Sequence, residues 1–370
     1  MTTERPHLLI GTSVRYLSQS AHRAGMQVVA LDCFVDDDTR RAASRSHPLT
    51  ALTQQALMQA LAELGEADDA TWSYAAGFEA DPEALAALAR QQRNLLGNAP
   101  DVLRLLADPD RYFNLLDTLE IDYPKTVFGR PADTSGWLYK AAGRQGGYQV
   151  WPADGVEPQE PGYYQRCLSG ELCSLLFAAN GKAMQALGFN RLSAFAPQQG
   201  DFRFTCAISG YRPEAQLADQ MTQVAQRLTR ALGLRGINGV DFVLHQGKAY
   251  LLELNARPPA SLELYELRLP LGGLQTHIAA CQGELPAPPA NDASSSGLQI
   301  VYAPRRLRIG RLRWPEWVSD RPRAGSSIAI GAPLVSVRAM ADSIQAVAER
   351  LRQRTQAVIE LLEKPAEAVA

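Results

Sequence analysis

The chain has 370 residues, of which 46% are hydrophobic and 21% charged, a balance typical of a globular protein with two or three domains. Its formal net charge of −2 argues against a protein that binds nucleic acid or an anionic membrane, because either function needs a basic surface. Small-molecule partners are favoured instead.

The cysteines and the N-terminus indicate a cytoplasmic protein. The five cysteines are scattered and odd in number, with no C-x-x-C pair, as expected in a reducing compartment. The start of the chain carries no basic-then-apolar leader, and no run approaches the ~18 apolar residues that a membrane span needs.

The first hundred residues predict an open parallel α/β domain, with a boundary near residue 100. A strand from His7 leads through Gly11 and a helix to a second strand that ends at Asp32, and such a βαβ unit builds a parallel sheet. Only Gly11 of the G-x-G-x-x-G fingerprint is present, so the alternative interpretation as a dinucleotide-binding domain is the weaker one.

Three polar residues close to predicted strand ends in this domain are candidates for substrate binding. Ser13 and Arg15 follow the first strand, and Glu79 follows a later strand that ends near Tyr74. Open α/β sheets bind ligands at the carboxyl ends of their strands, so these side chains are expected at one edge. A plain surface role for each residue is the alternative.

A second domain is expected over residues 101–284. It contains a helix from Asp108 or Pro109 to Leu119, a glycine-rich segment at 137–150, and a helix at 213–233 with apolar residues at helical spacing. A Pro and Ser-rich linker at 285–297 follows. Residues 298–370 predict a small module of short strands and a final helix.

The most informative segment is a predicted hairpin at 239–259. Two apolar runs flank a turn at His245-Gln-Gly-Lys248, and pairing across the turn sets Asp241 opposite Glu253 to within one residue. Because side chains alternate along a strand, Glu253 and Asn255 share a face. Oxygen ligands of this kind suit Mg²⁺, so the hairpin predicts a metal site; an acidic strand end without a metal is the alternative.

This segment resembles the metal-binding strands of the ATP-grasp superfamily, in which an Asp is followed about a dozen residues later by Glu-x-Asn and then Arg-Pro. Here Glu253 stands twelve residues after Asp241, and Arg257-Pro258 follows Asn255. The resemblance implies an α/β (α+β) ATP-grasp fold with an N-terminal open parallel domain, a glycine-rich lid at about 125–180 and a small β-rich C-terminal module.

The resemblance also implies ATP and Mg²⁺ (or Mn²⁺) as cofactors and assigns roles along the chain. Asp241, Glu253 and Asn255 would bind the metal. Catalysis would fall to Lys140, at the α/β-phosphates, and to Arg257, at the γ-phosphate or acyl phosphate. The other nucleotide contacts would be Arg111, where the family has Lys, the lid glycines Gly146 and Gly147, Gln165 at the adenine linker and Glu171 at the ribose.

The implied reaction activates a carboxylate as an acyl phosphate and transfers it to an amine. The run from Glu253 to Glu263 is similar to tyramine-glutamate ligases and to ATP-grasp proteins of one-carbon cofactor (methanofuran or methanopterin) biosynthesis. The alternatives are a carboxylase-like enzyme that uses bicarbonate and a sensor that binds ATP without turnover. The C-terminal module is a candidate for homodimer contacts.

Overall fold

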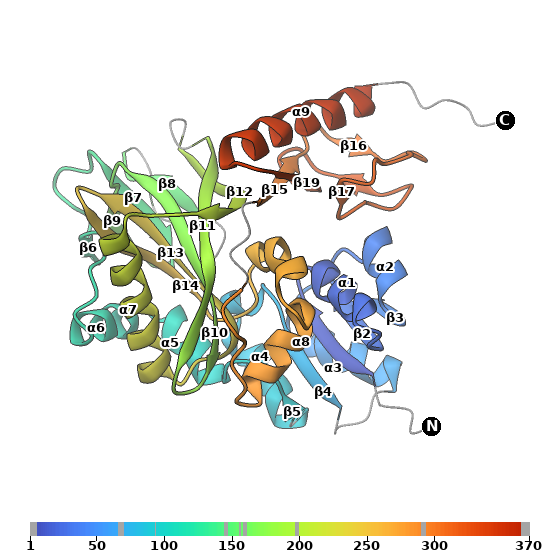
Figure 1. Cartoon of the computed structure of the whole chain (residues 1–370), viewed down its shortest axis with the longest axis horizontal. Helices are drawn as coiled ribbons and strands as arrows, with labels where there is room; N and C mark the ends of the chain where they lie inside the picture. Colours follow the sequence, from blue (N-terminus) through green and yellow to red (C-terminus); the bar gives the residue numbers. More distant parts are fainter. Residues whose placement is uncertain are drawn as a thin grey trace.

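The computed structural model describes residues 6–65, 70–92, 94–143, 147–154, 157, 161–196, 200–289 and 294–363. A long antiparallel sheet runs through the middle of the molecule (Figure 1). The N-terminal parallel sheet packs beside it, a small lid sheet lies at its other side, and the C-terminal helix covers its far end.

The N-terminal sheet has the strand order β3-β2-β1-β4-β5, and every neighbouring pair is parallel. This confirms the open parallel α/β domain. Its elements are β1 (His7–Gly11), α1 (Arg15–Arg23), β2 (Val28–Asp32), α2 (Asp37–Ala42), β3 (Arg45–Pro48), α3 (Gln54–Leu64), β4 (Thr71–Tyr74), the 3₁₀ helix η1 (Phe78–Ala80), α4 (Pro82–Gln91) and β5 (Asn94–Leu95).

The lid is an antiparallel sheet of strand order β6-β9-β7-β8. Two helices precede it, and the second begins with Pro109, where a missing N–H costs nothing, and is capped by the Asp108 side chain. These elements are α5 (Pro100–Ala107), α6 (Pro109–Thr118), β6 (Thr126–Val127), β7 (Trp137–Ala141), β8 (Val150–Pro152) and β9 (Gly162–Arg166).

The central sheet has the order β14-β13-β10-β11-β12-β15-β19-β17. Helix α7 carries apolar residues at helical spacing and buries them against β10, β11 and β14. The elements up to the C-terminal part are β10 (Glu171–Asn180), β11 (Met184–Ala196), β12 (Asp201–Tyr211), α7 (Ala215–Leu232), β13 (Arg235–His245), β14 (Lys248–Asn255), the 3₁₀ helix η3 (Ala260–Arg268) and α8 (Gly272–Cys281).

The C-terminal strands extend the central sheet. β15 begins at Ser295, inside the stretch expected to be a linker, and pairs with β12 through Cys206↔Gln299 and its neighbours. Helix α9 then packs on β15 and β19. The elements are β15 (Ser295–Tyr302), β16 (Leu307–Arg308), β17 (Val318–Ser319), β18 (Ser327–Ile328), β19 (Pro333–Ala341) and α9 (Ile344–Glu363).

Candidate functional site

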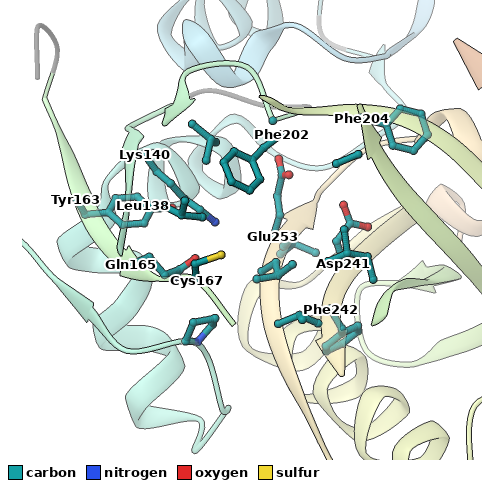
Figure 2. A pocket seen from close by; sticks show the side chains of 18 of the residues that line it. Leu138, Lys140, Tyr163, Gln165, Cys167, Phe202, Phe204, Asp241, Phe242 and Glu253 are labelled. Atoms are coloured by element: carbon teal, nitrogen blue, oxygen red, sulfur yellow. The ribbon is translucent and has the colours of Figure 1, made fainter. Parts of the chain in front are cut away.

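A cavity of about 610 Å³ lies between the lid and the β13–β14 hairpin. Strands β7 and β9 line one side, β13 and β14 the other, and residues 166–170 connect the two. Figure 2 shows Lys140 from the lid, and Asp241 and Glu253 from the hairpin, around this space.

The hairpin forms as its sequence predicts. Gln246 and Gly247 have φ values of +48° and +76°, as a two-residue type I′ turn requires. The resulting register pairs Asp241 directly with Glu253, which confirms the expected pairing. The Asn255 amide donates a hydrogen bond of 3.2 Å to Asp241 Oδ2, so the three oxygen-bearing side chains gather at one end of the hairpin.

The two carboxylates of the hairpin are half-buried. Burial raises the pKa of Asp241, against the opposing charge of Arg257, and burial together with the charge of Asp241 raises the pKa of Glu253. Two neighbouring carboxylates that are partly desolvated are stabilised by a cation. The donor set of two carboxylates and an amide fits Mg²⁺, which commonly takes one or two carboxylates and completes its shell with water and phosphate oxygens.

Within the described ranges, no cluster of three His, Cys, Asp or Glu side chains could hold a metal ion. A site closed entirely by protein ligands is therefore not seen there. The hairpin instead leaves positions for a ligand's own oxygens.

Arg257 connects the hairpin to the N-terminal domain. Its Nε donates to Glu79 Oε1 at 2.7 Å, and Glu79 Oε2 accepts a bond of 2.7 Å from the Gly77 backbone N–H. Glu79 itself lines the cavity. Burial would lower the pKa of Arg257, but the charge and hydrogen bond of Glu79, and then the charges of Glu253 and Asp241, raise it.

Lys140 projects from β7 into the cavity (Figure 2). Burial lowers the pKa of its ammonium group, and the charge of Glu253 opposes that effect. A cation held this way can be stabilised further by an anionic ligand in the cavity.

The glycine-rich loop is described only in part. Gly147 lines the cavity with φ +72°, and a Cβ there would stand 1.9 Å from the Phe202 carbonyl oxygen of β12. Only glycine permits this close approach of lid to sheet. Gly146 lies outside the described residues.

The predicted adenine and ribose positions differ in their surroundings. Gln165 is buried, lines the cavity and donates a bond of 3.1 Å to Thr126 Oγ1. Glu171 does not line the cavity; it accepts a bond of 2.7 Å from the Tyr211 hydroxyl and pairs with Arg191 at 3.1 Å. Its ribose role would require a change of partners.

Arg111 is exposed on α6 and does not line the cavity. The next residue, Tyr112, does. Consecutive helical side chains are about 100° apart, so the phase that points Tyr112 inward turns Arg111 towards solvent. The structure does not bring Arg111 to the other predicted nucleotide residues.

Two of the candidate substrate-binding residues in the N-terminal domain, Ser13 and Arg15, do not line the cavity. Ser13 is half-buried after β1, on the same sheet edge as Gly77, whose Cβ would meet Thr12 Oγ1 at 2.3 Å. Arg15 is buried, and its guanidinium bonds Asp320 at 2.8 and 3.2 Å and Glu263 at 2.7 Å. A contact between Arg15 and a substrate carboxylate would require one of these ion pairs to open.

Sequence reasoning missed several cavity residues. Phe202 and Phe204 of β12 line it, while Arg203 between them faces the other side of the sheet, in a groove of about 1000 Å³ beside α9. This alternation is visible in the sequence but indicates only a strand with two faces. Tyr112 and Tyr163 also line the cavity, and no local pattern distinguishes them from core aromatics.

Comparison with known proteins identifies the segment that carries this site. A family model described as an ATP-grasp domain matches residues 137–261. A search of curated proteins gives no match. In the described ranges, no helix is long and apolar enough to cross a membrane.

Solved structures of similar fold span almost the whole chain. The biotin carboxylase domain dimer of Hydrogenobacter thermophilus 2-oxoglutarate carboxylase, in complex with MgADP, ADP and bicarbonate, is 12% identical with a TM-score of 0.72, covering 94% of this chain and 88% of its own. The N5-carboxyaminoimidazole ribonucleotide synthetase of Thermotoga maritima is 14% identical with a TM-score of 0.69, covering 95% and 98%. The Campylobacter jejuni biotin carboxylase–βγ-ATP complex is 13% identical with a TM-score of 0.71, covering 94% and 90%.

Proposed function

We propose that this chain, whose residues 137–261 match an ATP-grasp domain, is an ATP-dependent ligase that activates a small-molecule carboxylate as an acyl phosphate and transfers the acyl group to an amine. One observation carries the proposal. Two half-buried carboxylates, Asp241 and Glu253, line the same cavity as the half-buried ammonium group of Lys140, an arrangement suited to Mg²⁺ and the phosphates of ATP.

The reaction would proceed in two steps. A carboxylate oxygen of the substrate attacks the γ-phosphorus, the bond to the β–γ bridging oxygen breaks, and ADP leaves with the bonding electrons. The amine nitrogen then attacks the acyl carbon, inorganic phosphate leaves, and the nitrogen loses a proton. The products are ADP, phosphate and an amide.

The chain's own residues would position these reactants. Lys140 would neutralise phosphate charge, and Arg257, held by Glu79, would orient the γ-phosphate or the acyl phosphate. Asp241, Glu253 and Asn255 would hold Mg²⁺ or Mn²⁺, which supplies further charge neutralisation at the phosphoryl oxygens. Gly147 would let the lid backbone approach the nucleotide, and Gln165 would lie at its base.

The finer assignment concerns the substrate. The run from Glu253 to Glu263 supports an amino-acid carboxylate such as glutamate, with a role in methanofuran- or methanopterin-type cofactor synthesis as part of the same proposal. A cytoplasmic homodimer is likewise proposed. Size-exclusion chromatography with light scattering tests the dimer.

Bicarbonate is the second candidate for the carboxylate. It is supported by the structure of similar fold that holds MgADP and bicarbonate. Bicarbonate would enter the same first step, with carboxyphosphate in place of an organic acyl phosphate.

ADP release tests these candidates together. Purified protein is incubated with MgATP and a matrix of amino acids and amines, with and without bicarbonate, and hydroxylamine is added to trap an acyl phosphate as a hydroxamate. The proposal expects ADP and a hydroxamate only with a particular carboxylate, and neither with the Glu253→Gln variant. Release that depends on bicarbonate alone favours the carboxylase-like reaction, and nucleotide binding without ADP release in any combination favours a sensor.

A further inference from the structure

A groove of about 1000 Å³ lies on the far face of β12, between the central sheet and α9. In the part of the chain that the structure describes, β12 and β15 form only three residue pairs, which end at Cys206↔Gln299. Beyond that pair the Tyr302 hydroxyl of β15 reaches back to β12 and donates to the Phe204 carbonyl oxygen at 2.6 Å. The groove therefore opens where strand pairing stops, and its volume lies at the upper end of the range for small-molecule sites.

The body of the groove is apolar. One face of α9 lines it over about 22 Å, from Ile344 through Ala348 to Ile359, as residues at helical spacing do. Two large apolar side chains of the lining, Phe195 and Ile330, are 49% and 72% exposed. Exposed apolar side chains gathered in one groove are typical of a binding site.

The charged side chains of the lining are all cationic. They are Arg191, Arg203 and Arg352, and none of the described residues that line the groove is Asp or Glu. Outside the lining, Arg191 pairs with Glu171, Arg203 with Asp201 and Arg352 with Glu349. The three arginine side chains are still 49%, 19% and 68% exposed. Because a guanidinium has five N–H donors and exposed ion pairs are weak, each can also bind an anion in the groove.

Arg203 holds its guanidinium group against aromatic surface. Its guanidinium carbon lies 4.5 Å from the centroid of the Tyr302 ring and 4.9 Å from that of the Phe195 ring. Asp201 and the Gly331 carbonyl oxygen accept its hydrogen bonds, which fix its orientation. A positioned cation beside exposed aromatic surface is what an organic anion with an apolar body needs.

We propose that this groove binds a small organic anion with an apolar body, its acidic group at the guanidinium groups and its apolar part against Phe195 and α9. The inference does not rest on the proposed function, because Arg203 and the cavity residue Phe204 lie on opposite faces of β12. The groove and the cavity between lid and hairpin do share Ser193 and Ala194 of β11 as lining residues. Binding in the groove must therefore be measured with the other cavity both empty and filled.

Two fluorescent probes of similar shape test the role of charge. Anilinonaphthalene sulfonate is an anion with an apolar body, and N-phenylnaphthylamine has nearly the same body without the sulfonate. Both are titrated into the full chain with and without saturating MgADP. We expect a single anionic probe to bind per chain, about tenfold more tightly than the neutral probe, and to remain bound when MgADP is present.

Two variants change the charge of the groove and little else. Arg352→Gln removes a cation, and Gln345→Glu adds an anion in the first turn of α9, where the helix dipole favours an acidic side chain. We expect each to weaken binding of the anionic probe about threefold to fivefold and to leave the neutral probe unchanged. Arg350→Gln is the matched control, because Arg350 is exposed on the same helix and does not line the groove. It should bind both probes as the wild type does.

The inference is overturned if both groove variants bind the anionic probe like the wild type, if they weaken both probes equally, or if MgADP displaces the anion. Binding that does not saturate would mean an adventitious additive only, and would overturn it as well. So would light scattering that shows a wild-type dimer which the groove variants dissociate, because a second copy of the chain would then cover the groove. Loss of the proposed ligase function leaves this inference standing, since neither probe is a nucleotide.

Discussion

The carboxyl groups of Asp241 and Glu253 lie in surroundings that favour a bound cation. Burial raises the pKa of both, and the charge of Asp241 raises the pKa of Glu253 further. An ionised carboxylate out of water costs several kcal/mol unless a cation compensates it. The hairpin alone therefore carries an unfavourable charge arrangement that a divalent cation would relieve.

Glu253→Gln should separate metal binding from folding. The substitution keeps the shape of the side chain and removes its charge, so we expect turnover to fall about a hundredfold or more and nucleotide binding to lose its dependence on Mg²⁺. The unfolding temperature without metal should stay equal or rise, because a desolvated charge is gone. Glu284→Gln, at an exposed position after α8, is the control for a carboxylate far from the cavity.

Wild-type turnover or unchanged Mg²⁺ dependence in Glu253→Gln would falsify the metal assignment. A large fall in unfolding temperature would instead mean that Glu253 has a structural partner. Isothermal titration with MgADP and a thermal melt provide both measurements.

From the sequence alone, the orientation of such a side chain can be predicted only where it lies on a strand, because alternation along a strand fixes the face on which each residue lies. Period-two alternation and a two-residue turn are enough to place Asp241 opposite Glu253. The same reasoning cannot choose between Arg111 and Tyr112, because the rotation of α6 is set by ring packing with the distant lid strand. An error of one residue on a helix moves a side chain by about 100°.

At the scale of elements, Gly147 of the lid lies directly against the backbone of β12. Gly147→Ala would place a Cβ against the Phe202 carbonyl, and the positive φ adds strain, so the loop must move away from the sheet. We expect nucleotide affinity to fall about tenfold and the unfolding free energy to drop by about 1–3 kcal/mol.

Gly233→Ala is the matched control for that variant. Gly233 ends α7 with φ +62°, and among the described residues no atom lies within 4 Å of the place that an alanine methyl group would take, so the substitution carries only the backbone cost of about 1–2 kcal/mol. Nucleotide affinity should not change. Equal affinities in both variants would show that contact between lid and β12 is not needed for binding.

His277 of helix α8 makes contacts that we expect to be sensitive to acid. His277 accepts a bond of 2.9 Å from the Ile237 N–H, and its other ring nitrogen lies 3.0 Å from the Leu96 carbonyl oxygen, so the neutral ring joins α8 to β13 and the N-terminal domain. Burial lowers the pKa of His277 from 6.5 to about 4. The stability it contributes is therefore complete above about pH 6.5 and is lost as the pH falls towards 4.

Urea unfolding between pH 7 and 4 measures this effect. For one such group we expect a loss of up to about 1.4 kcal/mol per pH unit inside that window. His277→Gln should show a shallower slope whatever its stability at neutral pH, whereas His22→Gln, at an exposed position of α1, should keep the wild-type slope. Equal slopes for wild type and His277→Gln would contradict the assignment. His7, whose pKa burial lowers to about 3, adds a slope of its own through the same window in every variant, so the comparison with His277→Gln is unaffected.

Most helices and strands can be predicted from local sequence patterns, but the pairing of strands that are far apart in the chain cannot. Periodicity and turn chemistry predict helix α7 and the β13–β14 hairpin to within a few residues. They do not predict the pairing of β15 with β12, because its hydrogen bonds join segments far apart in the chain and each strand alone shows only a short apolar run.

At the scale of the whole molecule, charged contacts hold the N-terminal sheet against the rest. Arg15 of α1 reaches Glu263 of η3 and forms a paired hydrogen bond with Asp320, just after β17. Burial alone would raise the pKa of Asp320, but the charge and hydrogen bonds of Arg15 hold it below its usual range. The parts that would form the two sides of an acceptor site are thus fixed to each other by a buried ion pair.

The last prediction decides between this structural role of Arg15 and the substrate contact expected from the sequence. If Arg15 joins the domains, Arg15→Ala removes the principal cation of Asp320 and Glu263 and leaves Arg338, 3.7 Å from Glu263, as the remaining one, so we expect a loss of at most about 3–5 kcal/mol in unfolding free energy. Asp320→Asn should also destabilise the protein. The double variant should lose less than the sum of the two, with a coupling of about 1–3 kcal/mol, because both substitutions remove the same interaction.

A substrate role would give a different pattern in the same variants. Arg15→Ala would then raise the apparent KM for the carboxylate with little change in nucleotide affinity or stability, and Asp320→Asn would not be coupled to it. Urea unfolding of the four proteins in the cycle, with KM for the carboxylate identified by ADP release, measures both quantities. Strong coupling in stability with an unchanged KM would assign Arg15 to the contact between domains, and Arg257 would remain as the guanidinium next to the reacting phosphate. Additive changes in stability with a raised KM would place the substrate at the edge of the N-terminal sheet.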